Sequence, residues 1–326
     1  MSKITVLGAG GWGLALAITL HCNKHTVNVW SPFAQEVELL AKKRENEKLL
    51  KGISLPEAIT VTDDIGVAKG SDVTVIATPS FAVRQTAARL RTVAHHGIVV
   101  NVAKGFEKES GLRLSQVISE ELPSSNIVVL SGPSHAEEVA RKLPTMLTAS
   151  GEDKNSLETV QRIFSNEFLR VYTNPDIIGV ELGGALKNII AVAAGVCDGI
   201  GLGDNSKAAL ITRGLAEMTR VGVAMGAEQK TFAGLTGMGD LIVTCTSLHS
   251  RNHRFGELVG RGVGVREALD TVGTVEGYYA CEIAYKLAKE HGQDVPIIET
   301  CYQLLFEDQP VEGVVENLMT RPFRKE

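Results

Sequence analysis

The first half of the chain alternates short apolar runs with longer amphipathic stretches. Near-continuous apolar, β-branched runs predict strands at residues 3–7, 26–30, 72–78, 97–103 and 126–132. Strands that are apolar on both faces are typical of parallel sheets covered by helices. Between the strands, apolar positions recur at helical spacing, and the clearest predicted helices span residues 12–23 and 33–50. This alternation predicts a doubly wound, mainly parallel sheet, the α/β architecture of a Rossmann domain.

The pattern changes near residue 174. Apolar runs at 144–150 and 168–174 predict one or two further strands, and beyond them long stretches with helical periodicity are separated by glycine-rich turns. A chain of 326 residues with 44% hydrophobic content is long enough to build two cores. We therefore expect an α/β domain over residues 1–174 and a mainly α-helical domain over residues 175–326.

Composition and charge narrow the class of protein. The chain has 33 Lys and Arg against 38 Asp and Glu, a net charge of -5, without the basic excess typical of nucleic-acid binders. Its 5 cysteines are scattered and form no C-x-x-C pair, which predicts reduced thiols rather than a disulfide framework or a metal site. The chain begins in a strand-like segment rather than a signal peptide, and its longest apolar run, 189–197, is too short to span a bilayer. We expect a cytoplasmic protein.

A glycine-rich segment follows the first predicted strand. In "ITVLGAGGWGLALAITL", Gly8, Gly10 and Gly13 form a G-x-G-x-x-G motif. In such a motif the glycines make a tight turn, let the backbone approach a pyrophosphate and let helix and strand pack closely. The N–H groups at the start of the helix then face the phosphates. Because a strand precedes the motif and a helix follows it, we predict dinucleotide binding; a purely structural turn is the alternative.

The end of the second predicted strand bears on the choice between NAD and NADP. A carboxylate there would bind the ribose hydroxyls of NAD. The sequence reads "VWSPF", however, and has no carboxylate before Glu36. A 2′-phosphate would meet no repulsion there, and Ser31 is expected to donate a hydrogen bond to it, although no Arg stands beside it. We therefore expect NADP or NAD as the cofactor, with NADPH moderately preferred.

Polar residues follow two neighbouring strands in the first half. Lys104 comes just after the strand at 97–103, and Gly132 and Ser134 end the strand at 126–132. Open α/β sheets bind their ligands at the carboxyl ends of the strands, so these residues are candidates for ligand binding. An ordinary solvated lysine is the alternative for Lys104.

The second half carries further polar candidates. Asp240 and Thr244 are four residues apart and share one face of a predicted helix. A compact donor set suited to a phosphate stands in "HSRNHRFG": Ser250, Arg251 and Asn252. An arginine can bind a phosphate through two parallel hydrogen bonds. The alternative for Arg251 is a plain basic surface, and we assign no role to His95, His96, His249 or His253.

One lysine stands in an otherwise apolar helix. In "ELGGALKNIIAVAAGVCDG", Lys187 follows Gly183 and Gly184 by one turn. Burying an ammonium costs several kcal/mol unless it is paired, on the order of the penalty found for buried ions. The side chain therefore either extends to solvent or serves chemistry inside the protein.

Together these segments resemble NAD(P)-dependent glycerol-3-phosphate dehydrogenases, especially the bacterial type. The resemblance covers nearly the whole chain and rests on "GAGGWG", "AKGFE", "SGPSHAEE", "VELGGALKNIIA", "GDNSKAALITRGLAEM", "GLTGMGDLIVTC", "SRNHRFG" and "TVEGY". It implies a Rossmann domain, a helical substrate domain, and the interconversion of dihydroxyacetone phosphate and sn-glycerol 3-phosphate for glycerophospholipid synthesis. It implies no metal, and the apolar helical second half favours a homodimer.

The resemblance also implies roles for individual residues. Lys187 takes the position of the proton acceptor, with Asp240 and Lys104 beside it as catalytic residues. The implied substrate contacts are Lys104, Gly132, Ser134, Asp240, Ser250, Arg251 and Asn252. We expect Lys187, as the proton acceptor, and Thr244, on the same helix face as Asp240, to contact the substrate as well. The implied cofactor contacts, beyond the glycine motif and Ser31, are Gly11, Trp12, Lys104, Ala136, Arg251, Thr274 and Glu276. Many bacterial members have Ser in place of Gly11, and Pro32 at the ribose end supplies no charge.

The reaction that the resemblance implies explains a lysine in an apolar helix. When hydride reaches a ketone, negative charge develops on the carbonyl oxygen, and a positioned ammonium stabilises that charge and gives up its proton. Two other functions stay open. Another two-domain β-hydroxyacid or sugar-acid dehydrogenase would use the same architecture and a helical lysine. A redox sensor that binds NAD(H) would keep the glycine motif but has no need for Lys104, Lys187 and Asp240 together.

Overall fold

The computed structural model describes residues 1–93, 97–311, 313 and 318–322. His95 and His96 lie outside the described residues. The chain divides into two compact units, Met1–Glu181 and Leu182–Glu326. All five cysteines are free thiols, and Cys245, Cys281 and Cys301 are buried.

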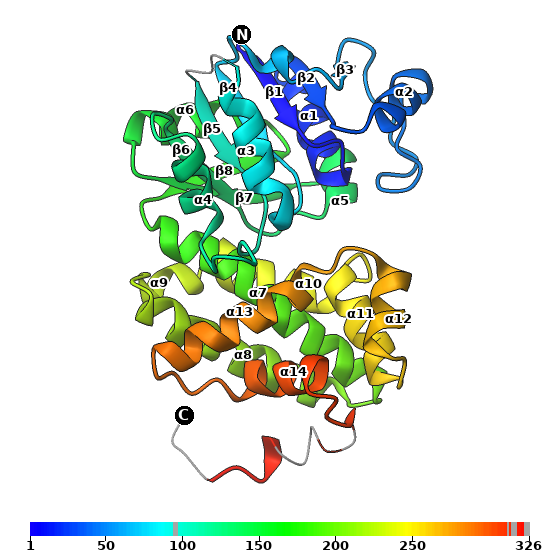
Figure 1. The fold of residues 1–326 in the computed structure, drawn as a ribbon, viewed down its shortest axis with the longest axis vertical. Coiled ribbons are helices and arrows are strands. Elements are labelled where there is room, and N and C mark those ends of the chain that lie inside the picture. Colours follow the sequence, from blue (N-terminus) through cyan, green and yellow to red (C-terminus); the bar gives the residue numbers. More distant parts are fainter. Residues whose placement is uncertain (94–96, 312, 314–317, 323–326) are drawn as a thin grey trace. The chain divides into compact units, whose positions relative to one another are not determined.

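The first unit is built on an eight-stranded sheet with the order β3-β2-β1-β4-β5-β6-β7-β8 (Figure 1). Neighbouring strands are parallel except for β6 and β7, which are antiparallel. The strands are β1 (Lys3–Leu7), β2 (Thr26–Trp30), β3 (Thr60–Thr62), β4 (Val73–Ile76), β5 (Ile98–Asn101), β6 (Ile127–Ser131), β7 (Thr145–Gly151) and β8 (Leu169–Asn174). The doubly wound, mainly parallel sheet is therefore confirmed; only the short β3 has no counterpart in the prediction.

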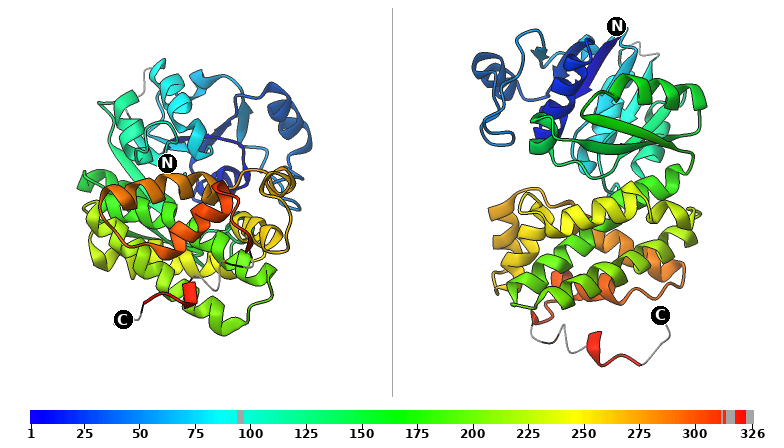
Figure 2. Two further views of the ribbon diagram at one scale, coloured as in Figure 1. Left: turned by 60° about the horizontal axis from the view of Figure 1, so that its bottom comes forward. Right: turned by 180° about the vertical axis from the view of Figure 1, so that it is seen from behind.

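Helices cover both faces of this sheet. They are α1 (Gly11–Cys22), α2 (Ala34–Lys43), α3 (Val83–Arg91), α4 (Leu114–Glu121), α5 (Ala136–Ala140) and α6 (Lys154–Phe164). Ile4 and Val6 of β1 pack into a cluster that includes residues of α1 and α6, whereas Leu7 belongs to a second cluster with α3 and α4. Figure 1 shows α3 and α4 on the near face, and the rear view in Figure 2 shows α6 on the other. Burial on both faces explains why these strands are apolar at nearly every position.

The helix predicted at 33–50 ends early, because α2 stops at Lys43. Arg44 follows with φ at 52°, in the left-handed region where a non-glycine residue ends a helix. Its guanidinium donates to the backbone carbonyls of Leu55, Pro56 and Ile59. These hydrogen bonds hold the chain after α2 against the loop that leads to β3, and tertiary contacts thus override the helical pattern of residues 44–50.

The second unit is helical in every regular element of its described residues, as predicted for the second half. The helices are α7 (Ile177–Gly199), which begins in the first unit, α8 (Asp204–Ala224), α9 (Gln229–Phe232), α10 (Asp240–Thr246), α11 (Arg251–Gly260), α12 (Val265–Val272), α13 (Glu276–Glu290) and α14 (Pro296–Phe306). A π-helical turn, Leu235–Gly239, leads directly into α10.

The long helix α7 is apolar along most of its length. Its 23 residues are long and apolar enough, by length and composition alone, to cross a membrane, although the uninterrupted apolar run within it is shorter. Most of this helix is buried inside the protein. Its apolar character is therefore that of a core helix, around which the other helices of the unit assemble.

Candidate active site

The glycine-rich turn between β1 and α1 has the shape that a bound pyrophosphate requires. Gly8 has φ at 125°, and its N–H donates to the carbonyl of Trp30 at 2.8 Å, which joins the turn to the end of β2. A Cβ atom on Gly13 would lie 2.2 Å from the Gly8 carbonyl oxygen, so helix and strand pack too closely for any side chain. A Cβ atom on Gly10 would meet nothing within 4 Å, which leaves the backbone open to an approaching ligand.

Leu49 and Ala136 lie next to Gly11, which the resemblance names as a cofactor contact. A Cβ atom on Gly11 would lie 2.5 Å from the carbonyl oxygen of Leu49, so the loop after α2 leaves no room for a side chain at this position. The same atom would lie 3.7 Å from Cβ of Ala136, the first residue of α5. Trp12 and Ala136 both pack against the core cluster under the turn. Gly11, Trp12 and Ala136 therefore gather at one place on the first unit.

Lys104, Gly132 and Ser134 meet at the carboxyl ends of β5 and β6. Lys104 Nζ donates to the Gly132 carbonyl at 2.8 Å and lies 3.2 Å from Ser134 Oγ. Ser134 Oγ in turn donates to the same carbonyl at 2.8 Å. Because Lys104 is half-buried and held by these groups, it is positioned rather than freely solvated. The structure thus brings together the three residues predicted at this edge.

The arrangement around Ser31 corrects the expectation for the ribose end. Ser31 is buried, with 1% of its surface exposed, and its Oγ donates to the carboxylate of Glu36. A hydroxyl has one proton to donate. That proton is directed to Glu36 and not toward a 2′-phosphate, and the carboxylate absent from the end of β2 in the sequence is supplied by the first turn of α2.

The amine of Lys187 contacts two side chains of the second unit. Its Nζ lies 3.0 Å from Asp240 Oδ1 and donates to Thr244 Oγ1 at 2.6 Å. Lys187, Asp240 and Thr244 are 5%, 1% and 4% exposed. The Asp240 and Thr244 side chains, four residues apart on α10, therefore face the same amine. A side chain that extends to solvent is excluded, because the charge of Lys187 is matched by a buried carboxylate.

The packing of α7 against the π-helical turn produces this geometry. A Cβ atom on Gly183 would lie 2.6 Å from the carbonyl oxygen of Thr236, so only glycine lets the two backbones come this close. The π-helical turn leads into α10, which begins at Asp240. Lys187 lies one helical turn after Gly183 on α7, and its amine therefore meets the Asp240 carboxylate. Thr244 Oγ1 donates to the Asp240 carbonyl at 2.5 Å, which leaves its lone pairs to accept from Lys187.

The donor set at the start of α11 has a more structural role than its sequence suggests. Ser250 is the N-cap of α11, and its Oγ accepts from the N–H of His253 at 3.2 Å. Asn252 Nδ2 donates to Asn188 Oδ1 at 2.9 Å, and Asn252 Oδ1 accepts from the N–H of Gly277 at 2.8 Å. Asn252 therefore ties α11 to α7 and α13, whereas the side chain of Arg251 is exposed.

The hydrogen bonds of Asn252 lie close to the other predicted residues of the second unit, Thr274 and Glu276. Asn188 is the neighbour of Lys187, so the first turn of α11 is anchored one residue from the buried amine. Glu276 is the first residue of α13 and precedes Gly277, and Thr274 lies two residues earlier. Both side chains are partly exposed. Asp240 and Thr244 of α10 thus contact Lys187 directly, and Asn252 joins α11 and the start of α13 to α7 at the residue after Lys187.

A hydrogen-bonded triad in the second unit was not predicted. Asp198 lies 2.7 Å from Lys207 Nζ and 2.8 Å from His253 Nε2. Burial raises the pKa of Asp198, but the hydrogen bonds from Lys207 and His253 outweigh this and lower it. His253 is 55 residues from Asp198 in sequence, and although all three residues stand in segments quoted above, nothing in those segments indicated that they meet. Because His253 follows Asn252, this triad braces the first turn of α11.

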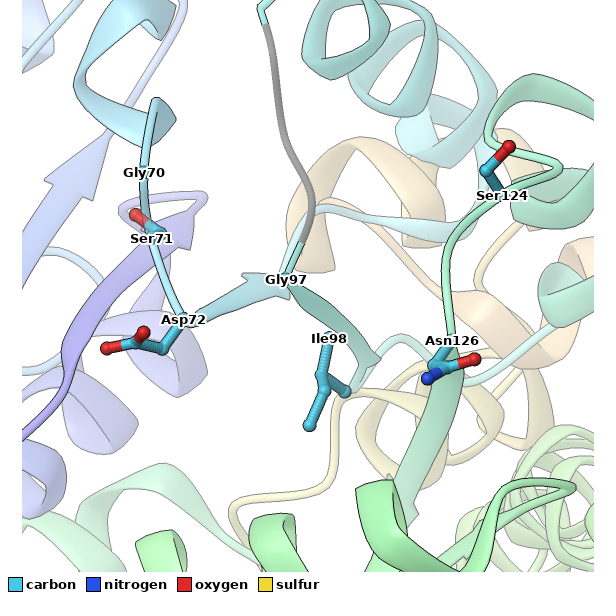
Figure 3. Close-up of a pocket in the computed structure, with 7 residues that line it drawn as sticks. All are labelled: Gly70, Ser71, Asp72, Gly97, Ile98, Ser124 and Asn126. Carbon is cyan, nitrogen blue, oxygen red and sulfur yellow. The ribbon is translucent and has the colours of Figure 1, made fainter.

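A separate pocket lies at the opposite ends of the strands. It is lined by Gly70, Ser71, Asp72, Gly97, Ile98, Ser124 and Asn126, which flank the amino-terminal ends of β4, β5 and β6 (Figure 3). Open α/β sheets bind ligands at the carboxyl ends of their strands. None of the predicted site residues lines this pocket, and we assign it no role.

A doubly wound sheet with a glycine-rich βα turn, followed by a helical unit with a buried lysine–aspartate pair, defines a class: the two-domain dehydrogenases that use a nicotinamide dinucleotide. Residues 3–157 match the family model of the NAD-dependent glycerol-3-phosphate dehydrogenase N-terminus. Residues 176–316 match that of the NAD-dependent glycerol-3-phosphate dehydrogenase C-terminus. The chain belongs to this family.

Individual relatives agree along the whole chain. It is 49% identical over 329 residues to a protein of Clostridium perfringens, covering 100% of this chain and 99% of that one. It is 50% identical over 327 residues to a protein of Bacillus pumilus, covering 98% and 95% of the two chains. Both relatives are named NAD(P)+ glycerol-3-phosphate dehydrogenases. The crystal structure of glycerol-3-phosphate dehydrogenase from Coxiella burnetii matches with a TM-score of 0.94 and 36% identity, covering 98% of this chain and 99% of that one.

These matches decide between the functions that the sequence left open. They favour an enzyme over a sensor, and the glycerol-3-phosphate dehydrogenases over other two-domain dehydrogenases. The chain is an oxidoreductase of this family that uses NAD or NADP.

Proposed function

We propose that this chain reduces dihydroxyacetone phosphate to sn-glycerol 3-phosphate, and catalyses the reverse reaction, with Lys187 as proton donor and acceptor. Family membership supports the reaction. The observation that carries the role of Lys187 is its burial against Asp240 and Thr244. A buried amine with a fixed donor direction is suited to a carbonyl oxygen that becomes an alkoxide.

The proposed chemistry follows from the charges around Lys187. The bound nicotinamide supplies a hydride in one direction and accepts it in the other. As the carbonyl carbon is reduced, the ammonium of Lys187 stabilises the negative charge on the oxygen and transfers a proton from Nζ to it. Asp240 stabilises the charged form of the lysine, and Thr244 fixes its orientation by accepting one of its hydrogens. In the reverse direction the neutral amine takes the proton from the alcohol.

The substrate phosphate needs cations that the protein has not already neutralised. Arg251 presents an exposed guanidinium at the start of α11, where Ser250 caps the helix and Asn252 anchors it. We propose that Arg251 binds the phosphate and that Lys104, Gly132 and Ser134 contact the substrate. Residues 1–174 would then carry the cofactor, and residues 175–326 most of the substrate contacts.

Cofactor binding is assigned to the glycine-rich turn and the residues around it. The N–H groups at the start of α1 suit the pyrophosphate. Gly11, Trp12 and Ala136 line the same place. We propose that Lys104, Arg251, Thr274 and Glu276 complete the cofactor contacts.

The test is a steady-state assay with the purified protein, NADH or NADPH, and dihydroxyacetone phosphate, followed by loss of nicotinamide absorbance. We expect oxidation of at least one cofactor, and no comparable turnover of unphosphorylated dihydroxyacetone. Equal turnover of the two ketones would contradict the phosphate assignment. Cofactor binding without turnover of any ketone or hydroxyacid would favour the sensor.

We further propose a cytoplasmic homodimer that supplies glycerol 3-phosphate for phospholipid synthesis. Five free cysteines suit a reducing compartment. Met238 and Ile242 are 41% and 46% exposed and lie four residues apart, an apolar surface available for a second copy. Sedimentation at micromolar concentration tests the dimer; a monomer across that range would rule it out.

A further inference from the structure

A carboxylate from α2 lies beside the end of β2, although the sequence has no Asp or Glu directly after this strand. Glu36 lies in the first turn of α2, five residues after Ser31, and its carboxylate accepts the hydrogen bond of Ser31 Oγ. The Gly8 N–H bonds the Trp30 carbonyl, so the residue before Ser31 contacts the glycine-rich turn. In Rossmann domains the adenosine ribose lies beyond the pyrophosphate at the end of the second strand. The carboxylate of Glu36 is thus at the ribose end of the cofactor site.

Ser31, the hydrogen-bond donor to this carboxylate, is held in place by the backbone. The Ser31 N–H donates to the Thr62 carbonyl at 3.1 Å, which ties Ser31 to β3. The Phe33 N–H approaches Ser31 Oγ at 3.4 Å, so that oxygen accepts from the backbone while its proton goes to Glu36. The first turn of a helix also stabilises a negative charge. Glu36 therefore presents its carboxylate beside a serine whose own position is set by the backbone.

Of the cations that follow Ser31, Lys43 and Arg44 contact protein groups, whereas Arg89 lies over the ring of Trp30 at the end of β2. Lys43 lies 3.1 Å from Glu47, and Arg44 donates to the carbonyls of Leu55, Pro56 and Ile59. The guanidinium of Arg89 stacks 5.7 Å from the ring centroid of Trp30. A 2′-phosphate at the end of β2 would meet a carboxylate and a serine whose proton is already donated, whereas ribose hydroxyls would find an acceptor.

We propose that Glu36, positioned by Ser31, makes this enzyme discriminate against NADPH in favour of NADH. This rests on the proposed function only in placing the dinucleotide at the glycine-rich turn. It reverses the cofactor preference expected from the sequence. Glu36 is the specificity-determining residue and Ser31 positions it.

The test compares charge removal at Glu36 with the same change nearby. Glu36→Gln keeps size and hydrogen-bonding atoms but removes the charge. Glu38→Gln makes the same change on the same helix at an exposed residue without a part in the proposal, and Ser31→Ala releases Glu36. For each protein, kcat/KM for NADH and NADPH is measured at saturating dihydroxyacetone phosphate. The Kd of each cofactor is measured by nicotinamide fluorescence, which needs no turnover.

We expect the wild type to favour NADH about tenfold or more, a difference of about 1.4 kcal/mol. Glu36→Gln should shrink the ratio about tenfold, Ser31→Ala should shrink it less, and Glu38→Gln should leave it unchanged. A wild type that favours NADPH, or equal ratios in Glu36→Gln and Glu38→Gln, would overturn the proposal. If the wild type preferred NADPH and Arg89→Gln lost that preference, the proposal would also be overturned, and Arg89 would be the residue that selects the cofactor.

The two proposals fail in different ways. If dihydroxyacetone phosphate is not reduced but the Kd values favour NADH and shift in Glu36→Gln, the proposed function fails and the role of Glu36 stands. If turnover is normal and the Kd ratio does not respond to Glu36→Gln, the role of Glu36 fails and the function stands.

Discussion

The two units build their sites from different materials. In the first unit the glycine-rich turn presents backbone groups, and the half-buried Lys104 donates to the Gly132 carbonyl and the Ser134 hydroxyl. In the second unit the central groups are a buried ammonium and a buried carboxylate. Backbone shape suffices to hold a dinucleotide, but proton transfer needs a charge whose surroundings are fixed. Substitutions in the first unit should therefore change affinity, and those around Lys187 should change both chemistry and stability.

The largest expected effect follows from replacing Lys187 by Met, which keeps the volume and removes the charge. Turnover should fall by about 10² to 10⁴-fold, the usual contribution of a positioned acid and base. Asp240 would be left buried without its partner, which should cost about 3 to 5 kcal/mol of unfolding free energy. The assay is kcat together with urea denaturation.

A double variant separates these two losses. Replacing both members of a buried ion pair by apolar residues of similar size is often neutral for stability. Lys187→Met combined with Asp240→Leu should regain most of the lost unfolding free energy and stay inactive. If the double variant were as unstable as the single one, the pair would not be the source of the destabilisation.

Glu217 is another buried carboxylate of the second unit, and the pH dependence of the unfolding free energy tests its contribution to stability. Glu217 is 1% exposed and accepts from the N–H groups of Ile297 and Ile298 at 2.8 and 3.1 Å. Burial outweighs these hydrogen bonds and raises its pKa from 4.5 to about 7. The folded state thus binds the proton more tightly than the unfolded state. Its contribution to stability is fully present below pH 4.5 and is lost as the pH rises toward 7.

The expected loss between these pH values is about 3 kcal/mol. Chemical denaturation at several pH values measures it, with Glu217→Gln as the comparison. The Gln variant should lose this part of the pH dependence. If wild type and Glu217→Gln kept parallel stability curves from pH 4.5 to 7.5, the buried carboxylate would not be responsible.

The substrate phosphate should depend on Arg251. Arg251→Ala should raise the KM for dihydroxyacetone phosphate about 10- to 100-fold, because a charge-assisted hydrogen bond contributes about 1.5 to 3 kcal/mol. The change in unfolding free energy should be small, since the side chain is exposed. Arg254→Ala, an exposed arginine on the same helix, is the matched control. Identical KM values in the two variants would remove Arg251 from the phosphate site.

Lys104→Met should destabilise the protein much less than Lys187→Met does, and it sharpens the contrast with Lys187. Lys104→Met removes the hydrogen bonds to the Gly132 carbonyl and the Ser134 hydroxyl, which are neutral groups. The unfolding free energy should fall by about 1 kcal/mol, while KM rises. A loss as large as that of Lys187→Met would show that the two units do not differ in this way.

The sequence predicted most of the fold because the strands of the sheet are buried on both faces. The bounds of β1 and β2 were predicted to the residue, since Ile4, Val6 and Leu7 all enter the core. β3 is three residues long and polar at two of them, which leaves no periodic signal. The end of α2 was missed because Arg44 is fixed by carbonyls from a distant loop.

The candidate site was predicted less completely than the fold. The motif residues gather within each unit, because strand ends and helix starts place them there. Pro32 and the start of α2 lie between Ser31 and Glu36 in the sequence, so no regular spacing predicts their hydrogen bond. The Asp198 triad and the ties of Asn252 depend on how the helices pack around α7. Such contacts follow from tertiary structure, which local patterns do not contain.

The proton-donor role of Lys187 is tested most directly by chemical rescue. Lys187→Ala leaves a space beside Asp240 and Thr244 that a small alkylammonium ion fits in charge and size. We predict that ethylammonium restores reduction of dihydroxyacetone phosphate in proportion to its concentration, and that tetramethylammonium, which has no proton to give, does not. Equal rescue by both ions, or none in a folded variant that still binds the cofactor, would contradict the assignment of Lys187.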